Sequence, residues 1–446
     1  MTYNIAMVSL GCSKNLIDSE MMTGNLQQKG FKFINDPEDA DIIIINTCGF
    51  IDAAKEESID AIVEAENYKT EGRCKVLIVS GCMAERYKEE LMEQLPEVDA
   101  VVGTGNINEI YEIINETLKG KKVNRTGKID NDYYEDLPRV ISTPQHSAYI
   151  KIAEGCDSFC TYCIIPKLRG SYRSRKMDSV LKEAKTLAEN GTKELILIAQ
   201  DTGRYGFDLY GEYKLPELLD ELNKIDGIKW IRLLYVYPDA FTDSLVQSIK
   251  NNEKVVNYVD MPIQHINNNV LKRMNRKTSK EMITDLITNL REEIPDMTIR
   301  TTVIVGFPGE TEEEFMELYE YIGEAKFDRL GAFTYSKEEG TPAAKMEGHL
   351  GEEIKEQRQN KIMELQQEIS IEKNRHRINN TYTVLIEEKV EDGVFIGRTY
   401  MDSPEIDCIV YVHSDKKLEI GSFVAVNITD SLEYDLIGEI ANESSK

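Results

Sequence analysis

Short apolar segments alternate with helical segments in two separate series along this chain, and this alternation restricts its fold more than any other feature. In residues 1–120 the apolar segments are YNIAMVSL, DIIIIN, KVLIVSG and VDAVVG. Continuous apolar strands separated by helices are typical of a parallel sheet with helices on both faces. We therefore predict an N-terminal parallel-sheet α/β domain over residues 1–120.

The second series begins at Tyr149 and contains six apolar segments: YIKIAE, ELILIA, KWIRLLYV, YVDMP, IRTTVIVG and RLGAFTY. Six β/α units predict an incomplete parallel barrel, a partial (β/α)6 barrel, over residues 149–350, with its site at the carboxyl ends of the strands. Two helix starts within it are indicated by capping boxes, Thr278 with Glu281 and Thr311 with Glu314.

The remaining segments divide the chain further. Residues 121–148 are polar, contain two prolines and predict a linker. Residues 351–378 predict a long charged helix, and residues 379–446 predict short strands that form a small β-barrel. A chain of 446 residues with 41% hydrophobic residues is expected to form about three domains with packed cores. The predicted fold class is α/β multidomain.

A C-x3-C-x2-C motif in EGCDSFCTYCIIPKLRG follows the first strand of the second series. Its cysteines, Cys156, Cys160 and Cys163, are called the barrel trio below. Three thiolates on one loop can hold three corners of a 4Fe-4S cluster and leave the fourth iron without a protein ligand. The alternatives are a zinc site that lacks its fourth ligand and three buried thiols.

Three more cysteines, Cys12, Cys48 and Cys82, each follow a predicted strand of residues 1–120 and are called the N-terminal trio. The carboxyl ends of parallel strands lie along one edge of a sheet, so these three thiols are expected to converge. They predict a second three-cysteine cluster with an open iron. Cys74 precedes its strand, and it is left with Cys408 as a core residue.

Charge bears on the partner, because 79 acidic residues against 53 basic ones give a net charge of −26. Such a surface disfavours direct binding of nucleic acid and favours binding of basic polypeptides. The alternative is that the acidic residues only keep the protein soluble. Residues 378–446 carry 14 acidic and five basic residues, a net charge of −9. This predicted barrel therefore suits a partner rich in lysine and arginine.

With these domains in this order, the whole chain resembles the radical S-adenosylmethionine (SAM) methylthiotransferases, whose last domain is a TRAM barrel. The motifs that carry the resemblance are LGCSKNLIDSE, NTCGFIDAAKEES, SGCMAERY and EGCDSFCTYCIIPKLRGSYRSR. Some members modify adenosine in transfer RNA, and one group modifies an aspartate of a ribosomal protein. LGCSKNLIDSE, QDTGRYG, LLYVYPD and MPIQHINNNVLKRMNR are similar to the second group, with Ser13 in place of its usual proline.

The resemblance implies that the barrel trio binds the radical SAM cluster and the N-terminal trio an auxiliary cluster. It implies that a radical derived from SAM takes a hydrogen atom from the β-carbon of an aspartate in the small-subunit protein S-twelve, which then receives a methylthio group. A low-potential electron donor such as flavodoxin or ferredoxin is implied as a partner. No catalytic residue is assigned beyond the cysteines. Candidates for SAM binding are Tyr162, Gln200, Gln264, Ile304 and Gly306.

Three alternatives stay open: a transfer RNA methylthiotransferase, an iron–sulfur electron carrier and a zinc-binding interaction protein. The basic run Lys167, Arg169, Arg173 and Arg175 could neutralise cluster charge, meet the substrate carboxylate or form a solvated turn. The sequence has no apolar run of about 20 residues and no signal-peptide pattern, so we expect a cytoplasmic protein without membrane spans.

Overall fold

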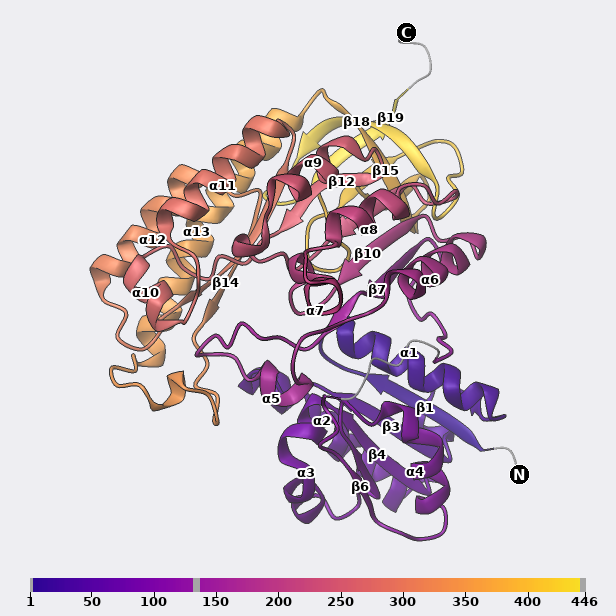
Figure 1. Ribbon diagram of the computed structural model, residues 1–446. Helices are drawn as coiled ribbons and strands as arrows, with labels where there is room; N and C mark the ends of the chain where they lie inside the picture. The colour runs from indigo at the N-terminus through magenta and orange to yellow at the C-terminus, as the bar shows by residue number, and fades with distance from the viewer. Residues whose placement is uncertain (1–2, 131–136, 442–446) are drawn as a thin grey trace.

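The computed structural model describes residues 3–130 and 137–441, which form three successive domains (Figure 1). The first contains a parallel sheet of six strands in the order β2-β1-β3-β4-β5-β6. The strands are β1 (Asn4–Ser9), β2 (Lys32–Phe33), β3 (Ile42–Thr47), β4 (Val76–Gly81), β5 (Ala100–Val102) and β6 (Val123–Arg125). The structure thus adds two strands to the four predicted ones: β2, and β6 from within the segment predicted as a linker.

Four helices cover the two faces of this sheet: α1 (Ser13–Gln28), α2 (Asp52–Thr70), α3 (Cys82–Gln94) and α4 (Ile110–Thr117). Side chains of α1 and α4 pack on one face of the sheet, and those of α2 and α3 pack on the other. All residues of β3 and β4 are buried, which explains why both strands are continuously apolar.

The second domain contains six parallel strands in the order β14-β13-β12-β11-β10-β7. This confirms the predicted partial barrel. The strands are β7 (Ser147–Lys151), β10 (Glu194–Ile198), β11 (Trp230–Leu233), β12 (Val255–Asp260), β13 (Thr298–Val305) and β14 (Arg329–Thr334). Its main helices are α6 (Met177–Glu189), α8 (Leu215–Leu222), α9 (Asp243–Asn251), α11 (Lys280–Glu293) and α12 (Glu312–Ala325).

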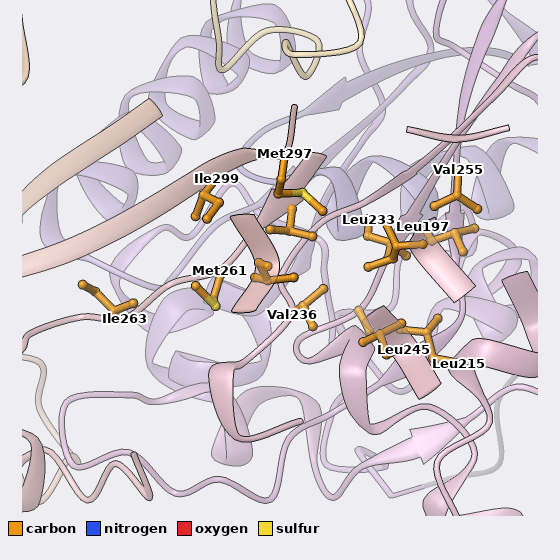
Figure 2. Packing of buried hydrophobic residues seen from close by; sticks show 14 of the residues in the cluster. Leu197, Leu215, Leu233, Val236, Leu245, Val255, Met261, Ile263, Met297 and Ile299 are labelled. Atoms are coloured by element: carbon orange, nitrogen blue, oxygen red, sulfur yellow. The ribbon is translucent and has the colours of Figure 1, made fainter. Parts of the chain in front are cut away.

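Alternate side chains of these strands enter two different cores. One set, which includes Leu197 and Leu233, packs against the outer helices and forms the cluster shown in Figure 2. The other set, which includes Ile196 and Ile198, packs in the same core as α1 and the N-terminal sheet. Helix α1 therefore lies between the two sheets and is buried over most of its length.

The two capping predictions have different outcomes. Helix α12 begins with the predicted capping box, in which Thr311 and Glu314 exchange hydrogen bonds with each other's backbone. The prediction at Thr278 is wrong. Helix α11 is capped one residue later, where the Ser279 hydroxyl accepts a hydrogen bond from the Met282 N–H.

A 26-residue helix, α13 (Glu352–Arg377), packs against β14 and α12 and leads to the third domain. This domain is a closed barrel of five strands, β15 (Thr381–Glu391), β16 (Val394–Arg398), β17 (Val410–His413), β18 (Phe423–Ser431) and β19 (Leu436–Ile440). The small β-barrel expected from the sequence is confirmed. In the described part of the chain, no helix has both the length and the apolar character needed to cross a membrane.

Buried ion pairs hold the third domain against the amino ends of the central strands. Glu194, the first residue of β10, accepts hydrogen bonds from Arg232 at 2.9 Å and from Arg398 at 2.6 Å. Burial raises the pKa of Glu194, but Arg398 and Arg232 outweigh burial and lower it to about 2. The barrel trio follows β7 and therefore lies toward the opposite, carboxyl ends of the strands.

Replacing Glu194 by Gln should destabilise the protein, because two buried guanidinium groups then lose their common carboxylate. We expect a loss of about 3–5 kcal/mol, seen as a lower denaturant midpoint. The matched control E372Q alters an exposed carboxylate that pairs with Lys326, and its midpoint should stay within experimental error. Equal midpoints for E194Q and E372Q would contradict this account of the domain junction.

Candidate functional site

The barrel trio lies on a loop between β8 (Ala153–Glu154) and α5 (Ile165–Arg169), directly after β7. Cys156 and Cys160 are buried, and Cys163 is half-buried. The loop is held by its own backbone: the Cys156 N–H donates to the Gly170 carbonyl at 3.1 Å, and the Cys163 N–H donates to the Cys160 carbonyl at 3.0 Å. Three sulfurs are therefore gathered at the carboxyl end of a central strand.

Burial makes the thiolate forms of Cys156 and Cys163 costly. It is the main cause that raises the pKa of Cys156 and of Cys163, and neighbouring thiolates raise both further. The compensating cation is Arg276, whose Nη1 lies 3.9 Å from the Cys160 Sγ. Its guanidinium also stacks on Tyr237 and donates to the Pro262 carbonyl. Sequence analysis missed Arg276 although it lies in a quoted motif, because only the fold brings it to the cysteines.

The N-terminal trio converges as predicted from strand order. Cys12 is the N-cap of α1 after β1, Cys48 follows β3, and Cys82 begins α3 after β4, where β1, β3 and β4 are neighbours in the sheet. Burial raises the pKa of Cys82 to about 12, and the charges of Cys12 and Cys48 add to this effect. Gly11, with φ of +86°, makes the convergence possible, since a Cβ there would lie 2.8 Å from the Cys48 Cβ.

The donor chemistry of both trios fits an iron–sulfur cluster. Each trio combines three sulfurs with a buried arginine, Arg276 beside the barrel trio and Arg169 beside Cys82. Among the described residues, no group of three or more Cys, His, Asp or Glu side chains has the spacing for a metal ion. The ligands of a cubane cluster bind different irons, so their sulfurs stand farther apart than ligands that share one ion.

The two trios lie near each other across the domain boundary. The Cys82 side chain packs with Ile164 and Leu168, the first of which directly follows Cys163. The Thr104 hydroxyl, on the N-terminal domain, donates to the Leu168 carbonyl. The segment that carries the barrel trio therefore packs against a cysteine of the N-terminal trio.

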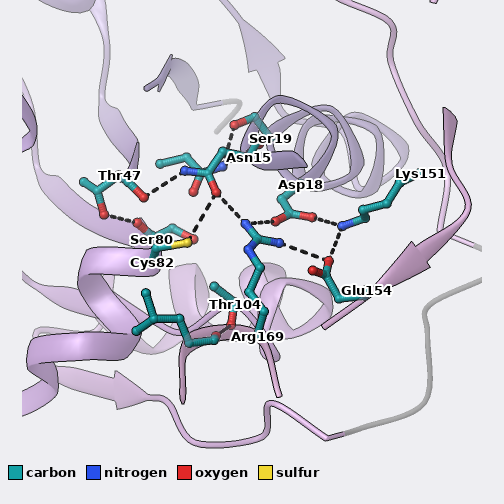
Figure 3. A network of polar contacts seen from close by, with 12 residues as sticks. Asn15, Asp18, Ser19, Thr47, Ser80, Cys82, Thr104, Lys151, Glu154 and Arg169 are labelled. Carbon is teal, nitrogen blue, oxygen red and sulfur yellow. Dashed lines mark hydrogen bonds and ion pairs between the residues drawn. The ribbon is translucent and has the colours of Figure 1, made fainter. Parts of the chain in front are cut away.

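Arg169, at the end of α5, is the centre of a buried polar network at this boundary (Figure 3). Its guanidinium contacts Asn15 at 2.5 Å and Asp18 at 3.0 Å, both on α1, and Glu154 at 3.0 Å. Lys151 pairs with the same two carboxylates, at 2.5 Å and 2.6 Å. Asn15 in turn donates to the Thr47 carbonyl, next to Cys48. Two cations and two carboxylates thus join the two domains in the interior.

The other members of the basic run lie elsewhere. Arg175 is buried and pairs with Glu183 on α6, while Lys167 donates to the Gly340 carbonyl. Arg173 lies 3.7 Å from Asp130. Of the three interpretations left open for this run, charge compensation at the clusters is favoured for Arg169 alone, because Arg169 is the member that lies beside Cys82.

The residues predicted to bind SAM lie at or near the carboxyl ends of the central strands. Gln200 donates to Glu154 at 2.7 Å and so joins the Arg169 network. Gln264 has a left-handed backbone with φ of +69° and forms a bridge to Val303 in β13. Tyr162 and Ile304 both pack against the small buried cluster that contains Phe307. These four assignments and that of Gly306 remain predictions.

Gly306 has a structural reason to be glycine. Its φ is +72°, and a Cβ there would collide with the Lys355 side chain of α13. The turn after β13 and the packing of α13 therefore both require glycine at this position.

Lys14, on the first turn of α1, is another residue that sequence analysis missed. It is 6% exposed, and its Nζ lies 3.0 Å from the centroid of the Tyr235 ring. Burial lowers the pKa of Lys14 to about 8, while the charges of Cys12 and Asp260 act in the opposite direction. No local pattern marks this lysine, because Tyr235 belongs to the other domain.

Comparison with known proteins agrees with the three-domain organisation. Three family models match the chain: "Uncharacterized protein family UPF0004" over residues 4–103, "Radical SAM superfamily" over residues 150–322 and "TRAM domain" over residues 378–441. A protein of Clostridioides difficile (strain 630), named "Ribosomal protein uS12 methylthiotransferase RimO", is 56% identical over 98% of this chain and 99% of its own. A protein of the same name from Thermoanaerobacter sp. (strain X514) is 54% identical over the same shares.

Solved structures share the fold at low identity. The radical S-adenosylmethionine methyltransferase TsrM from Kitasatospora setae has a TM-score of 0.55 at 13% identity, over 88% of this chain and 79% of its own. The cobalamin-dependent S-adenosylmethionine radical enzyme OxsB has a TM-score of 0.54 at 12% identity, over 81% of this chain and 56% of its own. These likenesses support the fold class alone.

Replacing Arg169 by Met should weaken the junction between the first two domains. Asp18 and Glu154 would keep only Lys151 as a cationic partner, which we expect to cost about 3–5 kcal/mol. The denaturant midpoint measures this loss. R173M changes a peripheral arginine of the same segment and is the matched control. If the two variants unfold at the same midpoint, the network does not hold the domains together.

Proposed function

The chain belongs to the RimO family of radical SAM methylthiotransferases, and we propose that it adds a methylthio group to the β-carbon of an aspartate in ribosomal protein uS12. The observation that carries the proposal is the pair of cysteine trios at one domain boundary, each beside a buried arginine. Two open irons within one site suit a reaction that must both generate a radical and deliver sulfur.

An unactivated C–H bond offers no proton that a side chain could remove, so hydrogen must leave as an atom. When bound, the two 4Fe-4S clusters supply an electron that cleaves SAM at the barrel trio and an open iron that carries sulfur at the N-terminal trio. A low-potential donor such as flavodoxin or ferredoxin would provide the electron. The residues of the chain supply ligands, charge compensation and exclusion of water.

Each buried arginine has a defined task in this proposal. Arg276 offsets the charge of the barrel trio from the barrel side, where Tyr237 and the Pro262 carbonyl hold it in place. Arg169 offsets the charge near Cys82 and fixes α1 against the strand that leads to the barrel trio. SAM would then lie among the strand ends that present Gln200 and Gln264, in a site from which the packed domains exclude water.

Charge supports a basic protein as the substrate. The third domain carries a net charge of −9 and the whole chain −26, which repels phosphate backbones and attracts lysine and arginine. Several carboxylates of this barrel, including Glu388, Glu391 and Asp392, are exposed. Modification of a ribosomal protein would take place in the cytoplasm.

The two trios can be tested separately by alanine substitution. The reconstituted full-length chain should hold about eight irons, and each triple alanine variant about four. Loss of the barrel trio should abolish formation of 5′-deoxyadenosine from SAM, whereas loss of the N-terminal trio should abolish methylthio transfer and leave SAM cleavage in place. Iron analysis and chromatography of the products measure both effects.

Two other cysteines serve as matched controls for this experiment. C74A and C408A remove buried or half-buried thiols that belong to neither trio and should change neither iron content nor product formation. A chain that binds about four irons in total, or an N-terminal triple variant that still transfers the methylthio group, would contradict the proposed roles.

The substrate is tested by incubating the reconstituted chain with SAM and reductant, in separate reactions, with small ribosomal subunits and with transfer RNA. We expect the mass of a methylthio group to appear on an aspartate of uS12 and the RNA to stay unmodified. Mass spectrometry of peptides detects modification of uS12, and mass spectrometry of nucleosides detects modification of the transfer RNA. Modification of adenosine alone would instead establish a transfer RNA methylthiotransferase.

A further inference from the structure

Lys14 is a buried cation at the domain boundary that the proposed chemistry has not used. Its side chain extends from α1, in the first domain, to the ring of Tyr235, which follows β11 in the second. The residue is 6% exposed. It lies two positions after Cys12, so Lys14 and a cysteine of the N-terminal trio both lie at the start of α1.

In the described part of the chain the Lys14 ammonium forms no ion pair with a carboxylate, and it lies over the ring of Tyr235 instead. The carboxylates nearby are already engaged. Asp260 accepts hydrogen bonds from Arg300 at 2.8 Å and from the Tyr235 N–H at 3.1 Å. Glu154 is shared among Lys151, Arg169 and Gln200. Contact with one aromatic face offsets only part of the free-energy cost of burying an ammonium group.

The surroundings of Lys14 favour an anion. The ammonium lies at the amino end of α1, a 16-residue helix whose dipole is positive there. Helix α1 carries no acidic residue in its first turn. Tyr235, which supports the amine from the other side, has a left-handed backbone with φ of +60°, a strained conformation that the packed structure must maintain. The Lys14 ammonium, the amino end of α1 and Tyr235 therefore define one position that is suited to bind an anion.

We propose that the Lys14 ammonium binds the side-chain carboxylate of the substrate aspartate and thereby sets the specificity for aspartate. This inference rests on the proposed function. A carboxylate at Lys14 would lie beside Cys12, so the β-carbon attached to it would be held close to the N-terminal trio. Arg169, near Cys82, is already engaged by Asn15, Asp18 and Glu154, whereas the Lys14 ammonium has no carboxylate partner in the described part of the chain.

The test compares uS12 with a uS12 variant whose target aspartate is replaced by asparagine, for the reconstituted full-length chain and its variants. K14M keeps the length of the side chain and removes the charge. We expect kcat/KM for the aspartate substrate to fall about 10- to 100-fold, mainly through KM, because a charge-assisted contact is lost. The asparagine substrate should be affected far less, so the preference for aspartate collapses.

Two further variants control this test. K14R keeps the charge and should restore most of the aspartate preference. K29M removes a lysine that also stacks on a tyrosine, Tyr111, at the other end of α1, and should behave as the parent protein. The preference is a ratio of two rates for the same preparation, so it is independent of the fraction of folded enzyme.

Three results would overturn the assignment of Lys14. K14M could keep the parent's preference for aspartate, or it could lose iron in proportion to its loss of activity, which would make Lys14 a support for the cluster. In both cases uS12 would still be modified by the parent chain, so the proposed function would stand. A parent chain that modifies only transfer RNA would overturn both proposals together.

Discussion

The Arg169 guanidinium lies in the interior of the molecule, where it pairs with Asp18 of α1 and Glu154 of β8. Through Asn15 it also reaches the loop that carries Cys48. A desolvated cation is tolerable only while its carboxylates stay in place, so the network allows the first two domains essentially one arrangement. The closeness of the two cysteine trios depends on that arrangement.

Helix α1 is the element through which this network positions the residues of the site. It packs between two parallel sheets, with Cys12 as its N-cap and Lys14 and Asn15 in its first turn. The third domain, the β-barrel, covers the opposite, amino ends of the central strands. Glu194 holds it there by pairing with Arg232 and Arg398. The acidic barrel is therefore held away from the cysteine trios, and in the proposed function it would attract a basic partner there without disturbing the charges of the clusters.

Much of this arrangement could be predicted from the sequence, because it follows from local periodicity. Parallel strands leave their carboxyl ends at one edge, which is why Cys12, Cys48 and Cys82 could be grouped from the order of the strands alone. Arg276 and Lys14 could not be recognised, since each acts through a residue of a distant segment. The cap predicted at Thr278 was wrong by one residue, because Ser279 offers an equivalent hydroxyl at the next position.

The central claim is that two iron–sulfur clusters share one interdomain site. Anomalous diffraction at the iron absorption edge, from crystals of the anaerobically reconstituted full-length chain, tests it most directly. The account predicts two iron peaks, one bounded by Cys156, Cys160 and Cys163 and the other by Cys12, Cys48 and Cys82, on either side of the Arg169 network. A single peak, or a second peak away from the N-terminal trio, would contradict it.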